Sequence, residues 1–176
     1  MSKMELKLAG SGGQGVILAA IILADAALDY GKNVVQSQSY GPEARGGMCK
    51  AEVIASDEQI WFSKVLNPTF LLALTQEALD TYAKDVDKDG VVMIDSSLEV
   101  PACLSGNRVI SVPILQTAKD VVGKSFTANI VAVAAINQAL GLVPFEVLKE
   151  SVLRRIPKGT DAINIKALEE GVKLVK

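Results

Sequence analysis

Histidine is absent from this chain of 176 residues, and its absence excludes several kinds of chemistry. A Ser-His-Asp or Cys-His catalytic group cannot form within the chain, because both use an imidazole as the general base. Metal sites that depend on histidine ligands are excluded for the same reason. We therefore predict no catalytic residues of these types and no metal-binding residues.

Cysteine is nearly as scarce, with only Cys49 and Cys103. Iron–sulfur clusters normally need four thiolates, so this chain cannot hold one alone. Free cysteines are usually small, buried, apolar side chains, and we expect that role for both rather than a disulfide or a redox pair. Any redox chemistry linked to this protein must come from a cofactor or from another chain.

Aromatic residues make up only 5% of the sequence, although hydrophobic residues make up 49%. The core must therefore consist of Val, Ile, Leu and Ala, which suits parallel strands covered by helices. The formal net charge is −2 and no run of basic residues occurs, so we expect no nucleic-acid partner. The apolar run from Val16 to Ala24 ends at Asp25 and is too short to span a membrane, and no signal peptide is recognised. A cytoplasmic protein is expected.

Strand-like and helix-like patterns alternate along the first two thirds of the chain. Strands are predicted at 4–9, 33–39, 48–56, 60–62, 70–74, 91–94 and 108–112, and helices at 16–30, 76–84, 127–140, 144–155 and 161–175. This alternation predicts an α/β fold, with one three-layer α/β/α domain over residues 1–176. The sheet is expected to be largely parallel, and a mixed sheet remains an alternative.

A glycine-rich turn separates the first predicted strand from the first predicted helix. It comprises Gly10, Ser11, Gly12, Gly13, Gln14 and Gly15, and we call it the glycine loop. Such a turn can offer backbone N–H groups to a phosphate at a helix N-terminus. The alternative is that its glycines only permit close packing of helix and strand. Gln14 is the one long side chain of the loop, and it could contact a ligand or cap the helix.

Two common functions of a glycine-rich turn are not supported by the residues around this loop. A dinucleotide site needs an acidic residue at the end of the second strand to bind a ribose hydroxyl, but that strand ends in Gln38-Ser39-Tyr40. A nucleoside triphosphatase needs a Lys-Ser or Lys-Thr pair after the glycines, and none is present. The loop is therefore predicted to receive a phosphate or carboxylate of unspecified origin.

A second glycine-flanked segment, residues 41–47, follows the second predicted strand, and we call it the second loop. Pro42 restricts the backbone there, and Arg45 offers a planar set of donors that matches a phosphate or carboxylate. An exposed ion pair with Glu43 is the alternative, but the surrounding glycines favour a binding or interface role. Because ligands collect beyond the carboxyl ends of parallel strands, we expect both loops to open onto one surface.

Two other sites remain open to more than one interpretation. Asp95-Ser96-Ser97 follows a strongly apolar strand, and a turn or helix cap is favoured over a ligand contact. Trp61 and Phe62 are equally compatible with a partner interface and with a place in the core.

The two loops together resemble those of the gamma subunit of 2-oxoacid:ferredoxin oxidoreductases. The segments that carry the resemblance are Gly-Ser-Gly-Gly-Gln-Gly-Val at 10–16 and Gln-Ser-Tyr-Gly-Pro-Glu-Ala-Arg-Gly-Gly at 38–47. The second segment looks most like the 2-oxoglutarate branch, while similar subunits serve pyruvate, branched-chain 2-oxoacids and indolepyruvate. The resemblance extends over the whole chain and includes Ser56-Asp57-Glu58 and Asn129.

This resemblance implies a multi-subunit enzyme that decarboxylates a 2-oxoacid, transfers the acyl group to CoA and reduces ferredoxin. Thiamine diphosphate, Mg²⁺ and iron–sulfur clusters are expected on alpha, beta and ferredoxin-like partner subunits, so the isolated chain is expected to be inactive. The glycine-loop residues Gly10, Ser11, Gly12, Gly13, Gln14 and Gly15 become candidate CoA-phosphate contacts. Candidates for the CoA or subunit interface are Tyr40, Gly41, Pro42, Glu43, Arg45 and Gly46. A non-catalytic nucleotide- or CoA-binding module is the alternative of another class, and a free-standing nicotinamide-dependent oxidoreductase is disfavoured.

Overall fold

A six-stranded sheet organises the computed structural model, which describes residues 3–40 and 47–176. Within these residues the strand order is β2-β3-β1-β4-β5-β6. The strands are β1 (Lys3–Ser11), β2 (Asn33–Tyr40), β3 (Met48–Ser56), β4 (Phe70–Ala73), β5 (Val91–Asp95) and β6 (Arg108–Val112). Each confirms a predicted strand to within a few residues.

The sheet is mixed. β1, β4, β5 and β6 run parallel to one another, whereas β3 is antiparallel to both β1 and β2. The first two strands of the chain are therefore not neighbours, because the β2–β3 hairpin returns β3 to the space between them. β1 also extends two residues into the glycine loop, since Gly10 and Ser11 lie opposite Cys49 and Met48 of β3.

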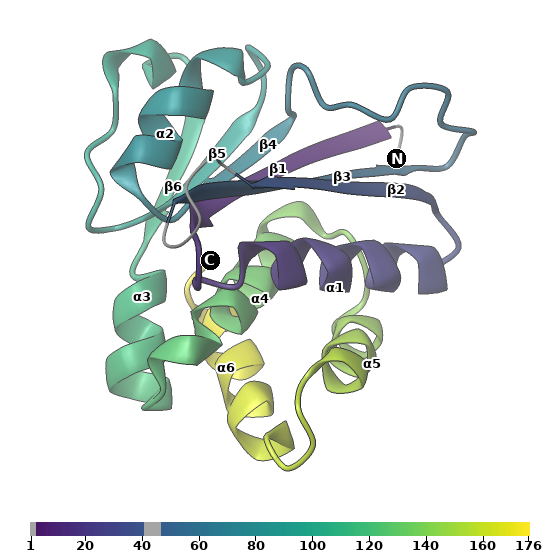
Figure 1. Cartoon of the computed structure of the whole chain (residues 1–176), viewed down its shortest axis with the longest axis vertical. Helices are drawn as coiled ribbons and strands as arrows, with labels where there is room; N and C mark the ends of the chain where they lie inside the picture. The colour runs from purple at the N-terminus through teal and green to yellow at the C-terminus, as the bar shows by residue number, and fades with distance from the viewer. Residues whose placement is uncertain (1–2, 41–46) are drawn as a thin grey trace.

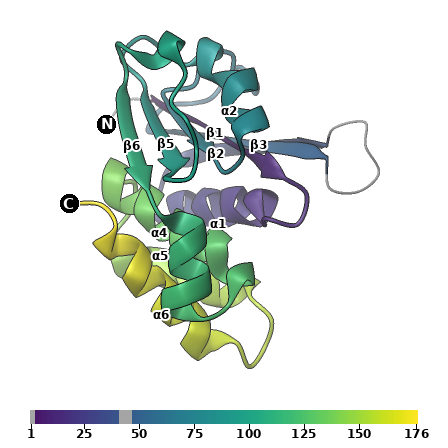
Figure 2. The same cartoon turned by 90° about the vertical axis from the view of Figure 1, so that its left-hand side faces the viewer.

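The helices lie on both faces of the sheet, as expected for a three-layer α/β/α domain. They are α1 (Val16–Asp29), α2 (Gln76–Tyr82), α3 (Ile114–Gln116), α4 (Ala128–Leu140), α5 (Phe145–Arg155) and α6 (Asp161–Lys173). Figure 1 shows α2 on one face and α1 and α4 on the other, with α5 and α6 farther from the strands. The turned view in Figure 2 shows the same separation of α2 from the remaining helices.

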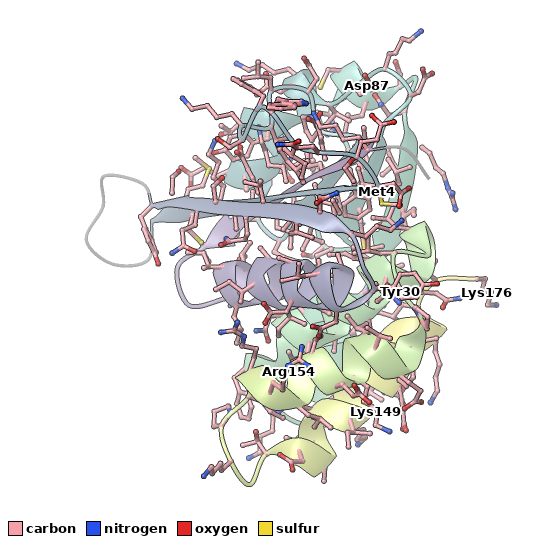
Figure 3. The ribbon with its side chains drawn as sticks, turned by 90° about the vertical axis from the view of Figure 1, so that its right-hand side faces the viewer. Met4, Tyr30, Asp87, Lys149, Arg154 and Lys176 are labelled. Carbon is pink, nitrogen blue, oxygen red and sulfur yellow. The ribbon has the colours of Figure 1, made fainter. Side chains whose placement is uncertain are left out.

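Helix α1 is enclosed by the sheet on one side and by other helices on the rest, which explains its nearly continuous apolar sequence. Leu6 and Leu8 of β1 are fully buried in the same core as the apolar residues of α1. On the far side, the Arg155 guanidinium donates to the Asp25 carboxylate at 2.6 Å. Arg154, labelled in Figure 3, pairs in the same way with Asp29. Two ion pairs thus fasten α5 to α1.

The predicted strand at 60–62 is wrong. Residues 57–69 contain no strand and cross the face of the sheet opposite α1 (Figure 1). β1 is already paired on both sides, by β3 and β4, so this segment has no free edge of β1 to join. Trp61 is 85% exposed and Phe62 is 54% exposed, so neither belongs to the core of this chain.

The expectation that both thiols are buried holds for only one of them. Cys49 is buried, and burial raises the pKa of its thiol. Cys103 is exposed because it lies in a one-turn 3-10 helix, Ala102–Leu104, in which Leu104 takes the buried position. Both cysteines are free.

Within the described ranges, none of the helices is both long enough and apolar enough to cross a membrane.

Candidate functional site

The glycine loop turns the chain from β1 into α1 through two left-handed residues. Gly13 has a φ of 93° and Gly15, the N-cap of α1, has a φ of 74°. Residues with a Cβ adopt this region at a cost, so glycine is required by the backbone at both positions. No side chain caps the helix start. The first backbone N–H groups of α1 are therefore of the kind that donate hydrogen bonds to a bound anion.

Gln14 has a role that the sequence did not indicate. Its side-chain oxygen accepts a hydrogen bond from the Ser11 backbone N–H at 2.8 Å, and its side-chain nitrogen donates to the Leu74 carbonyl at 3.4 Å. Gln14 thus neither caps α1 nor points a free amide at a ligand. It braces the glycine loop against the residue that follows β4.

The glycines of the loop divide into two kinds. A Cβ added to Gly10 would lie 2.5 Å from the Gln14 side-chain oxygen, and one added to Gly15 would lie 2.5 Å from the Asn129 side-chain nitrogen. At these two positions the close-packing interpretation is correct. Gly12 and Gly13 are exposed, and a Cβ on Gly13 would meet nothing within 4 Å. These two residues form the accessible part of the loop.

Asn129 brings the N-terminus of α4 beside the N-terminus of α1. Its side chain is buried, donates to the Gly15 carbonyl at 3.4 Å and accepts from the Ile130 N–H at 3.0 Å. Each helix N-terminus carries a partial positive charge. Their proximity adds a second favourable field for an anion at the glycine loop. Residue patterns could not reveal this contact, because Gly15 and Asn129 are 114 residues apart.

The ends of the second loop lie at the same edge of the sheet as the glycine loop. The Gly12 N–H donates to the Gly47 carbonyl at 2.9 Å, and Tyr40 lies opposite Cys49 of β3. The two ends of the second loop therefore lie close to the glycine loop, and the reason is the antiparallel β3 rather than two neighbouring parallel strands. Whether both loops open onto one surface stays a prediction, because residues 41–46 lie outside the described residues. Tyr40 is 70% exposed. Of the other candidate residues, Gly41, Pro42, Glu43, Arg45 and Gly46 lie outside the described residues.

Asp95 has the turn role favoured by the sequence. One carboxylate oxygen accepts hydrogen bonds from the Ser97 backbone N–H at 3.0 Å and from its hydroxyl at 2.6 Å. The other accepts from the Leu115 N–H at 2.8 Å, at the start of α3. Both oxygens therefore hold the carboxyl ends of β5 and β6 in place.

Sequence reasoning missed a buried group of charges on the sheet face opposite α1. Glu52 contacts the ammonium groups of Lys50 at 3.1 Å and Lys7 at 3.6 Å, and both ammonium groups lie over the ring of Tyr82. Burial lowers the pKa of Lys7. The alternation of Lys7 with Leu6 and Leu8 resembles a strand with one solvated face, and nothing local shows that residues 57–69 cover it. Among the described residues, no group of three or more potential ligands could hold a metal ion.

Comparison with known proteins identifies a family and several named proteins that this chain resembles. The family model described as pyruvate ferredoxin/flavodoxin oxidoreductase matches residues 5–174. The 2-oxoglutarate synthase subunit KorC of Methanocaldococcus jannaschii is 40% identical over 177 residues, which cover 99% of this chain and 95% of that protein.

Two solved structures have the same fold. The gamma subunit of a keto/oxoacid ferredoxin oxidoreductase from Geobacter sulfurreducens superposes with a TM-score of 0.85 and 44% identity, over 97% of this chain and 96% of that one. A 2-oxoglutarate:ferredoxin oxidoreductase from Magnetococcus marinus, with 2-oxoglutarate, coenzyme A and succinyl-CoA bound, superposes with a TM-score of 0.90. It is 22% identical and is matched over 99% of this chain and 31% of its own length, so it shows a likeness of fold alone.

Proposed function

The chain belongs to the pyruvate ferredoxin/flavodoxin oxidoreductase family, and on this premise we propose that it is the gamma subunit of a 2-oxoglutarate:ferredoxin oxidoreductase. The assembled enzyme would decarboxylate 2-oxoglutarate, transfer the succinyl group to CoA and pass the electrons to ferredoxin. This chain would contribute to CoA binding and to assembly of the subunits. The sequence similarity to the 2-oxoglutarate synthase relative extends over nearly the whole chain, and it supports 2-oxoglutarate as the substrate. Pyruvate, branched-chain 2-oxoacids and indolepyruvate are the alternatives within the family.

The convergence of backbone donors at one edge of the sheet is the observation that most supports a role in CoA binding. The exposed Gly12 and Gly13 lie beside the N-terminus of α1, and Asn129 holds the N-terminus of α4 next to it. The Gly12 N–H donates to the Gly47 carbonyl, so the candidate donors to an anion are the Gly13 N–H and the first N–H groups of α1. CoA carries phosphate groups, and phosphates bind where backbone N–H groups and helix N-termini point at them. Arg45 of the second loop is our candidate for a charged contact to the same cofactor, on the strength of the family resemblance.

The catalytic cofactors are assigned to partner subunits because this chain lacks the residues to hold them. It contains two cysteines and no histidine, whereas an iron–sulfur cluster normally needs four thiolates. Thiamine diphosphate, Mg²⁺ and the clusters would lie on alpha, beta and ferredoxin-like subunits. On this proposal the isolated chain neither decarboxylates a 2-oxoacid nor reduces ferredoxin.

Affinity purification of the chain from its native cells tests the assembly. We expect stoichiometric recovery of subunits that contain thiamine diphosphate and iron–sulfur clusters, together with CoA-dependent reduction of ferredoxin by 2-oxoglutarate. Recovery of the chain without such subunits would contradict the proposal and favour a non-catalytic CoA-binding module. Turnover of pyruvate in preference to 2-oxoglutarate would retain the subunit assignment and correct the substrate.

Calorimetry with CoA and the assembled complex tests the binding residues. Gly12→Val places a branched side chain on the accessible part of the loop, and Arg45→Ala removes the proposed cation. We expect each to weaken CoA binding by about tenfold or more, Gly12→Val because the new side chain blocks the approach of the ligand and Arg45→Ala because one charge-assisted hydrogen bond disappears. Lys88→Gln, which removes a lysine side chain that is 88% exposed on the turn before β5, is the matched control. Unchanged CoA affinity in both loop variants would refute these contacts.

A further inference from the structure

A pocket on the sheet face opposite α1 shares no residue with the glycine loop. It has a volume of about 400 Å³ and lies between the edge strand β2, its neighbour β3 and the segment 57–69. Its lining residues are Ser37, Gln38, Ser39, Lys50, Glu52, Ser63, Lys64, Val65 and Leu66. This volume falls in the lower part of the range found for small-molecule sites.

The strand register sets the floor of the pocket. Ser37 lies opposite Glu52, and Ser39 lies opposite Lys50. Directly opposed residues of antiparallel strands project from the same face, so two hydroxyls, one ammonium and one carboxylate meet on the floor. On the other side of β3, the strand β1 places Lys7 opposite Glu52.

The carboxylate of Glu52 is already occupied by partners within the chain. One oxygen contacts both Lys7 and Lys50, and the other accepts a hydrogen bond from the Val65 N–H at 3.3 Å and lies 3.5 Å from the Ser37 hydroxyl. Its side chain is only 9% exposed. Glu52 is the one carboxylate that lines the pocket, and both of its oxygens already have partners, so it does not balance a third positive charge; Asp85 adds a further negative charge near Lys7.

Lys64 of the segment 57–69 supplies that third positive charge. It is exposed and makes no hydrogen bond or ion pair with any part of the chain that the structure describes, and the same is true of the hydroxyls of Ser39 and Ser63. The pocket thus has an excess of cations and unused hydroxyl donors. Val65 and Leu66 add a short apolar wall.

We propose that this pocket binds a small dianion, either a phosphate or a short dicarboxylate, held between Lys50 and Lys64 with serine hydroxyls as additional donors. Two ammonium groups, one from the floor and one from residues 63–66, match two negative charges on one ligand better than they match a single charge. The inference depends on the pocket residues at 37–39, 50–52 and 63–66, and it stands whether or not the glycine loop binds CoA.

Backbone NMR of the full chain, titrated separately with sodium phosphate and sodium succinate, tests the proposal. Sodium chloride at matched ionic strength is the reference, and acetate is the monoanion comparison. We expect saturable shifts at the amides of Ser37, Ser39, Lys64 and Val65 with phosphate, succinate or both, and weaker shifts with acetate. Lys64→Gln should weaken binding about tenfold, and Ser39→Ala about threefold. Lys88→Gln, with the same loss of charge at a distant turn, should leave the affinity unchanged.

Three results would contradict the proposed binding of a dianion in this pocket. Shifts at these amides that grow linearly with ionic strength and are reproduced by chloride would show screening without binding. Equal affinity in wild type and Lys64→Gln would remove the proposed contact. Phosphate-induced shifts confined to Gly12 and Gly13 would likewise count against the pocket, while they would support the CoA-phosphate site.

Discussion

The backbone amide of Gly12 donates a hydrogen bond of 2.9 Å to the carbonyl oxygen of Gly47. This bond joins the glycine loop to the residue at which the second loop ends. Neither residue depends on a side chain for the contact, so the two loops are linked through the backbone itself. The backbone at the end of the second loop is therefore fixed to the glycine loop.

Gly15→Ala should destabilise the chain more than an ordinary left-handed glycine substitution. The new Cβ would meet Asn129 at 2.5 Å, in addition to the cost of a positive φ. We expect the free energy of unfolding to fall by about 2 kcal/mol or more, measured by urea denaturation. Gly31→Ala is the matched control, because Gly31 has a φ of 87° but open space around it, and should cost about 1 kcal/mol. Equal losses in the two variants would show that the Asn129 contact is unimportant.

Gln14→Ala should loosen the glycine loop, because it removes both hydrogen bonds that brace the loop. The expected loss of unfolding free energy is about 1–2 kcal/mol. Faster hydrogen exchange at the Ser11 amide should accompany it, since that N–H loses its acceptor. Gln116→Ala, at an exposed glutamine of α3, is the control. Unaltered protection of Ser11 in the Gln14 variant would contradict the bracing role.

Lys7 should make the free energy of unfolding depend on pH, and the direction of its pKa shift sets the direction of that dependence. Burial lowers the pKa of Lys7 below its ordinary value of 10.5, so the unfolded chain holds this proton to higher pH than the folded chain does. The free energy of unfolding therefore gains a contribution from Lys7 as pH rises from the folded pKa towards 10.5. Urea denaturation of wild type and Lys7→Met, kept below about pH 9.5 so that tyrosine does not ionise, should show wild type gaining relative to the variant. A constant difference between the two across this range would contradict the predicted shift.

The two thiols should react at very different rates. Cys103 is exposed, whereas Cys49 is buried with a raised pKa, and the thiolate is the reactive form. With a disulfide reagent under native conditions, one thiol per chain should react rapidly and the second only after denaturation. Cys103→Ser should abolish the rapid phase. Rapid reaction that persists in this variant would mean that the strand carrying Cys49 opens readily.

The fluorescence of Trp61 can show whether a partner subunit covers residues 57–69. It is the one tryptophan in the sequence and is 85% exposed. We expect its fluorescence in the isolated chain to be red-shifted and strongly quenched by acrylamide. If partner subunits cover this face, the assembled complex should show reduced quenching at Trp61, once other tryptophans of the complex have been replaced. Quenching that is equal in chain and complex would place the subunit interface elsewhere.

The strands and helices were largely predictable because their signals are local. Val91 to Ile94 and the apolar run of α1 form the elements that their composition predicts. Two features depended on long-range pairing instead. Placement of β3 between β1 and β2 could not be inferred from the strands themselves, since an alternating pattern specifies a strand but not its neighbour. The failure at 60–62 has the same origin, because an apolar segment becomes a strand only where it lies beside a strand edge, and residues 57–69 cross the face of the sheet instead.

The candidate site was predictable in outline and not in detail. The motif indicated a turn suited to an anion, and the exposed Gly12 and Gly13 fit that role. The packing roles of Gln14 and Gly15 require Leu74 and Asn129, which are distant in sequence. The Lys7–Glu52 contact was equally hidden, since residues 57–69 cover a face that the strand pattern alone presents as solvated.

The hairpin connection between β2 and β3 also has an evolutionary consequence. The chain leaves the sheet at Tyr40 and re-enters at Gly47, and both points are anchored by backbone pairing, to Cys49 and to Gly12 respectively. We therefore expect substitutions in the intervening sequence to leave the glycine loop and the strands in place. On this expectation, a lineage that recruits such a subunit to a new oxidoreductase would alter six consecutive residues, 41–46, and inherit the rest of the scaffold.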